Sequence, residues 1–107
     1  MADAQREQVR NCVARHSGLA IEKIAPESRL LHDLGIDGDD ANFLLIDYSK
    51  AFSVDMSGFT FDQFFRSEPH LFNFWKFFFG SKDHLLPLTV EDLYRSALQK
   101  KFVYDSR

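Results

Sequence analysis

Apolar residues recur at intervals of three and four along three stretches of this chain, the spacing of one buried helix face. The stretches cover about residues 3–16, 39–52 and 90–98. No segment shows a convincing run of apolar and polar residues in alternation, the pattern of a half-buried strand. The spacing therefore predicts an all-α bundle of about four helices, with room for a small two-stranded element in a Phe-rich region before the last helix.

The first two helices carry clear end signals. Ser17 and Gly18 should stop the first helix, because glycine favours the conformation that ends one. The second should begin where Asp39 or Asp40 can cap it, and it should run to about Phe52. Aspartates in its first turn also offset the positive end of the helix dipole.

The remaining segments are shorter or less regular. Residues 19–34 have aliphatic side chains without sustained periodicity, which predicts a long packed loop with about one turn of helix. A short helix should start near Thr60. The last helix should follow Pro87, with Thr89 as its cap and Asp92 completing a variant of the capping box.

Phenylalanine is the unusual part of the composition. The chain holds 12 Phe residues, and nine of them lie between Phe59 and Phe79. One helix face cannot bury so many rings, so part of this segment is a candidate contact surface. Those expected in the core are Phe61, Phe64, Leu71, Phe74 and Trp75. Those that fit either the core or a contact surface are Phe72, Phe77 and Phe79.

The bulk properties match one ordinary domain spanning residues 1–107. A single cysteine, Cys12, cannot form an internal disulfide, and the first ten residues have no apolar signal core, so a cytoplasmic location is expected. The longest apolar-rich run, Leu71–Phe79, is about half the roughly 20 residues that span a bilayer. No membrane span is predicted.

The net charge of −3 is unevenly distributed. Seven aspartates lie between Asp33 and Asp62, where Lys50 is the single Lys or Arg. The C-terminal end is basic, but its cations are scattered and form no stripe. Both features argue against nucleic acid as a partner.

The motifs that usually identify an enzyme or a metal site are not present in the sequence. The aspartates from Asp33 to Asp40 lack the EF-hand spacing and its terminal glutamate, so helix capping is the preferred interpretation. The four histidines form no pair at the spacing of four that binds zinc on a helix. Cys12 lies on an apolar stripe and should be a buried, inert thiol. We therefore expect no enzyme activity, no cofactor and no metal.

Two segments resemble parts of an acyl carrier protein. They are Leu34–Asp39, which leads into an amphipathic helix, and Leu88–Leu93, which opens the last helix. In that family a serine at the start of the second helix carries the phosphopantetheine arm. Aligning the leucine-glycine pairs places Gly38 on that serine, so the attachment oxygen is missing and the resemblance does not imply carrier activity.

A closer resemblance is to an uncharacterised bacterial family of short acyl-carrier-like proteins. Its recurring stretches correspond to Leu34–Asp40 and Val54–Phe59. The likeness covers roughly residues 26–65 and 88–102, and it implies an acyl-carrier-like fold with no assigned role. The insertion between Glu68 and Pro87 departs from the short third-helix region of a carrier.

The preferred interpretation is a non-enzymatic adaptor that binds a protein with a basic surface. Its candidate contacts are the acids of the second helix, Asp37, Asp39, Asp40 and Asp47. Two alternatives stay open: a genuine acyl carrier that uses an unorthodox site, and a homodimer or larger homo-oligomer that pairs through the Phe-rich segment.

Overall fold

The computed structural model describes residues 2–65 and 85–104, and this part of the chain is helical. Its elements are α1 (Ala2–Ser17), the 3₁₀ turn η1 (Ile21–Lys23), α2 (Gly38–Phe52), α3 (Phe61–Phe64) and α5 (Val90–Gln99). The described residues form two isolated β-bridges and no strand. The prediction of an all-α bundle of about four helices is confirmed.

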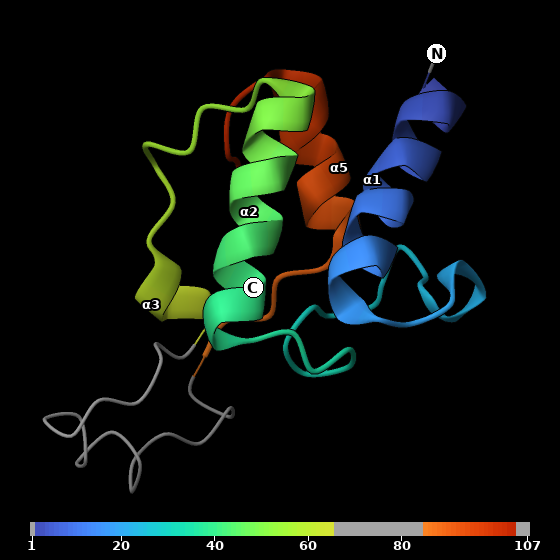
Figure 1. Ribbon diagram of the computed structural model, residues 1–107. Helices are drawn as coiled ribbons and strands as arrows, with labels where there is room; N and C mark the ends of the chain where they lie inside the picture. The colour runs from blue at the N-terminus through green and yellow to red at the C-terminus, as the bar shows by residue number, and fades with distance from the viewer. Residues whose placement is uncertain (1, 66–84, 105–107) are drawn as a thin grey trace, which may run out of the picture.

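Helices α1 and α2 lie side by side and run in opposite directions, and α5 packs against α1 (Figure 1). The apolar stripes expected from the sequence face inward. On α1, Val9, Cys12 and Val13 are buried. On α2 and α5 the buried apolar residues are Ala41, Leu44, Leu45, Tyr48, Phe52, Val90, Leu93, Tyr94 and Ala97.

One buried hydrogen bond joins α2 to α5 inside this core. The Tyr48 hydroxyl donates to the Leu93 carbonyl at 2.6 Å, and Tyr48 has no exposed surface. Burial raises the pKa of Tyr48, because the apolar surroundings disfavour the phenolate. The hydroxyl therefore stays protonated and available as a donor.

The start of α2 differs in detail from the prediction. The cap residue is Asp37, in extended conformation, and Asp39 and Asp40 lie in the first turn. The expectation that Asp39 or Asp40 caps the helix was therefore wrong. The chain turns into the helix at Asp37, which is extended, and at Gly38, whose φ of 56° lies in the left-handed region that glycine adopts readily.

The start of α5 follows the sequence prediction closely. Thr89 Oγ1 accepts a hydrogen bond from the Asp92 backbone N–H at 3.1 Å, and Asp92 Oδ2 accepts one from the Thr89 N–H at 2.9 Å. Both halves of the capping box are thus formed. Because Asp92 is 1% exposed, this box lies within the packed structure.

The loop between α1 and α2 is held to the start of α5. The Leu30 N–H donates to the Leu88 carbonyl at 2.8 Å, and the Val90 N–H donates to the Ser28 carbonyl at 3.0 Å. Ile24 and Leu30 are buried. These bonds and apolar contacts confirm a long loop that is ordered by packing.

A short stem joins the two described parts of the chain that flank residues 66–84. The Leu86 N–H donates to the Gln63 carbonyl at 2.9 Å, while Phe64, Phe65 and Leu85 are buried on either side of this bond. The Phe64 ring also contacts the Tyr104 ring edge-on at 4.9 Å. Phe64 is therefore a core residue, as predicted, and Phe61 packs on the core while partly exposed. The predicted core residues Leu71, Phe74 and Trp75 lie outside the described residues.

Candidate functional site

The outward side of α2 combines acids with exposed apolar side chains. Asp39 and Asp40 are exposed in its first turn. Phe43 is 57% exposed and Ile46 is 44% exposed, and residues three apart on a helix are neighbours on its surface. We call Asp39, Asp40, Phe43 and Ile46 the outer face of α2. The sequence interpretation found the two acids but missed Phe43 and Ile46, which fall between the buried positions of the helical stripe.

The four acids predicted to bind a partner do not share one surface. Asp37 is half-buried at the cap, and Asp39 and Asp40 are exposed. Asp47 instead faces α1, where its carboxylate meets Arg15 and His16. The helix start therefore carries a cluster of three acids, and Asp47 belongs to a second cluster.

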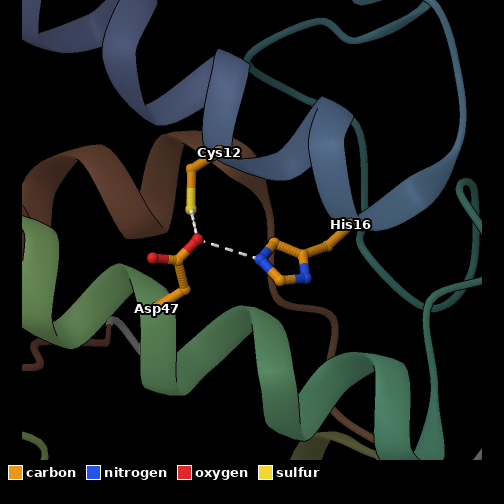
Figure 2. Close-up of side chains that lie close together, drawn as sticks. All are labelled: Cys12, His16 and Asp47. Atoms are coloured by element: carbon orange, nitrogen blue, oxygen red, sulfur yellow. Dashed lines mark hydrogen bonds and ion pairs between the residues drawn. The ribbon is translucent and has the colours of Figure 1, made fainter.

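That second cluster brings three chemically different side chains together between α1 and α2 (Figure 2). Cys12 and His16 project from α1 toward Asp47 of α2. Asp47 Oδ2 lies 3.9 Å from Cys12 Sγ and 3.0 Å from His16 Nε2. A ligand atom from each residue lies within 4.8 Å of those of the other two.

The surroundings of the cluster lower the pKa of its carboxyl group and raise the pKa of its thiol. Hydrogen bonds from His16 and then Arg15 lower the pKa of Asp47, because both partners favour the carboxylate. Burial and, next, the charge of Asp47 raise the pKa of Cys12 to about 11. The cluster thus holds a carboxylate that accepts hydrogen bonds beside a protonated thiol.

The arrangement differs from a catalytic triad, in which a nucleophile, a base and an orienting acid are hydrogen-bonded in that order. In such a chain the imidazole lies between the nucleophile and the acid. Here Cys12 and His16 both approach the same oxygen of Asp47, so the imidazole does not bridge the other two groups. Thiol, imidazole and carboxylate are instead the three side-chain types that ligate zinc.

The cluster was overlooked at the sequence level, although part of it is visible there. Cys12 and His16 are four residues apart on one helix, which places them on the same face. The zinc motif at this spacing consists of two histidines, and a cysteine with a histidine does not match it. The third member, Asp47, comes from a different helix, and its approach depends on how α1 packs on α2.

The Phe-rich contact candidates Phe72, Phe77 and Phe79 lie outside the described residues. Among the helices that are described, none is long and apolar enough to cross a membrane.

Comparison with known proteins identifies a family and no individual relative. No curated protein and no solved structure matches the chain. A model for a family described as "Protein of unknown function (DUF1493)" matches residues 6–105, which is nearly the whole chain. The chain therefore belongs to the DUF1493 family.

Proposed function

We propose that this protein is a non-enzymatic, acyl-carrier-like binding module that docks a partner protein through the outer face of α2. The observation that carries the proposal is the exposure of Phe43 and Ile46, one turn apart, beside Asp39 and Asp40. An apolar centre next to charged groups is the composition of a protein-binding patch. The complementary partner surface has an apolar socket and a basic rim.

The exposed pair contributes the apolar part of this interaction. Single exposed apolar residues are ordinary on protein surfaces, but Phe43 and Ile46 have the spacing of neighbours on one side of a helix, and both are exposed. Both project from a helix whose opposite side is fixed in the core by Leu44 and Tyr48. A rigid base of this kind limits the conformational entropy lost when the face is covered.

The acids contribute to the orientation of the partner and to the rate of association. Asp39 and Asp40 extend the negative charge of a chain whose net charge is −3. Exposed charges attract a basic partner over roughly the Debye length, about 8 Å at physiological salt, and mainly raise the association rate. Binding through this face should therefore weaken as salt concentration rises.

The backbone at Gly38 supports a module without the phosphopantetheine arm. Gly38 aligns with the attachment serine of acyl carriers, and its φ of 56° is a conformation that residues with a side chain adopt at a cost. Intact-mass measurement after co-expression with a phosphopantetheinyl transferase tests this point. An unmodified mass is expected, whereas a gain of one phosphopantetheine group would favour the genuine carrier.

The docking proposal is tested by cross-linked affinity capture from the native cell with matched variants. Phe43→Ser with Ile46→Ser removes the apolar centre, and Asp39→Lys with Asp40→Lys reverses the acids. Leu98→Ser is the control, because Leu98 is an equally exposed apolar residue, 48% exposed, on α5. A specific partner should be captured by the wild type and the control and lost from both double variants.

The captured partner is then purified for binding measurements. Loss of Phe43 should weaken binding by about 30-fold or more, the effect of an interface hot spot of about 2 kcal/mol. Reversal of the acids should slow association and reduce its salt dependence. Equal affinity for wild type and both double variants, or binding that ignores salt, would contradict docking through this face.

A further inference from the structure

We infer that Cys12, His16 and Asp47 form a binding site for a divalent transition-metal ion, for which Zn²⁺ is the best match to the donor set. The site is separate from the outer face of α2 and independent of the docking proposal. It lies on the side of α2 that meets α1 (Figure 2).

The geometry is close to what tetrahedral zinc requires. Zinc–ligand bonds of 2.0–2.3 Å at tetrahedral angles put pairs of ligand atoms about 3.4–3.6 Å apart. Asp47 Oδ2 lies 3.0 Å from His16 Nε2 and 3.9 Å from Cys12 Sγ. Shifts of about 0.4 Å would bring these two separations to the required values. The third pair, Cys12 Sγ and His16 Nε2, lies within 4.8 Å, so side-chain rotation would have to close it by up to about 1.3 Å.

The donor set selects the class of metal. Sulfur and imidazole ligands favour zinc and its neighbours over magnesium and calcium, which prefer oxygen. Three protein ligands leave one position of a tetrahedral ion for water. The side chains of His16 and Asp47 are 23% and 43% exposed, whereas Cys12 is 1% exposed. Cys12 is thus the innermost ligand, and the ion would enter from the solvent side, where His16 and Asp47 are exposed.

Metal binding exchanges bonds in a balanced way. The Cys12 thiol loses its proton to solvent as the S–Zn bond forms. The proton that His16 Nε2 shares with Asp47 also leaves, so that the Nε2 lone pair binds the ion while Nδ1 carries the ring proton. Asp47 Oδ2 gives up its hydrogen bonds to these two groups and becomes a ligand. No oxidation or reduction takes place.

Substitution of Arg15 can distinguish a metal site from a cluster held only by hydrogen bonds. Its guanidinium lies 3.2 Å from Asp47 Oδ2, the same oxygen that would bind the metal, and its side chain is 62% exposed. Arg15 therefore competes with a cation for Asp47 and can swing into solvent when one binds. Arg15→Gln should strengthen metal binding, whereas a hydrogen-bonded cluster without a metal would only lose one interaction.

The test is titration of the metal-free full chain with Co²⁺, followed by displacement with Zn²⁺. A thiolate-to-cobalt charge-transfer band and visible bands of tetrahedral cobalt are expected at one ion per chain. Zn²⁺ should also raise the thermal unfolding midpoint, because an ion that bridges α1 and α2 binds the folded state.

The variants assign the ligands. Cys12→Ser should abolish the charge-transfer band, and His16→Gln and Asp47→Asn should each weaken affinity at least about 100-fold, more than the loss of an outer-shell partner. His32→Gln controls for histidine substitution outside the cluster, and circular dichroism checks that each variant folds. Absence of the thiolate band in the wild type, or Zn²⁺ affinity that Cys12→Ser leaves unchanged, would overturn the inference. Weaker binding by Arg15→Gln would do so as well.

Discussion

Tyr48→Phe removes one hydroxyl from the core and leaves the ring in place. The lost bond is the 2.6 Å contact with the Leu93 carbonyl, which joins α2 to α5. Leu93 lies inside α5, so its carbonyl keeps its own helical partner four residues later. No acceptor is left without a partner, and the cost should approach that of a single net hydrogen bond, about 1 kcal/mol.

The assay is urea unfolding followed by circular dichroism, with thermal unfolding alongside it. A loss of about 1 kcal/mol should lower the thermal midpoint by roughly 4 °C for a domain of this size. Tyr104→Phe is the matched control, because the Tyr104 hydroxyl donates to the Pro87 carbonyl at the same 2.6 Å from a partly exposed position. Tyr104→Phe should lower the free energy of unfolding by less than Tyr48→Phe does, because water can replace the lost hydrogen bond.

The effect should also depend on pH. The pKa of Tyr48 is raised by burial above its ordinary value of 10.0, so its contribution to stability is complete below pH 10.0 and declines as the pH rises beyond it. The stability difference between wild type and Tyr48→Phe should therefore narrow at alkaline pH. A variant as stable as the wild type at neutral pH, or a difference that widens above that pH, would refute the reasoning.

Three further perturbations test the helix ends and one surface ion pair. Thr89→Ala should destabilise the protein by about 1–2 kcal/mol in urea unfolding, because it breaks the capping box, while Thr89→Ser should retain most of the stability. Gly38→Ser should cost about 1–2 kcal/mol in the same assay because of its φ of 56°, whereas Gly58→Ser, with no neighbouring atom within 4 Å of a new Cβ, should cost little. Arg29 lowers the pKa of Asp33 to about 2, so Arg29→Gln should raise that pKa in an NMR titration. The pair's contribution to stability should be present above pH 3.8 and be lost as the pH falls toward about 2.

Each of these expectations has a contrary result. Equal stability of the alanine and serine variants at Thr89 would show that the capping box contributes little. Equal costs at Gly38 and Gly58 would remove the argument from backbone conformation. An unchanged Asp33 pKa after Arg29→Gln would assign the shift to the Arg29 backbone N–H, which also donates to this carboxylate at 2.8 Å.

The sequence predicted the elements whose determinants are local. Helix α5 was placed correctly because Thr89 and Asp92 form their capping box within four residues. The apolar stripe of α1 likewise predicted which side is buried. The cap of α2 was misplaced because glycine permits several backbone conformations, and sequence alone does not say which one Gly38 adopts.

The candidate sites depended on tertiary structure and were harder to predict. Asp47 was grouped with the acids of the helix start because charge was read along the chain, whereas its partners lie on α1. Exposure of Phe43 and Ile46 depends on which positions α1 and α5 cover. Residue type does not encode that coverage.

The stem at Gln63 and Leu86 has a consequence for how the length of this chain can be changed. Its backbone hydrogen bond and the buried Phe64 and Leu85 hold together the two described positions that flank residues 66–84. The free energy of closing a chain between fixed points changes slowly with length, by about 0.6 kcal/mol for each doubling. The bundle should therefore fold with a longer or shorter segment between these points.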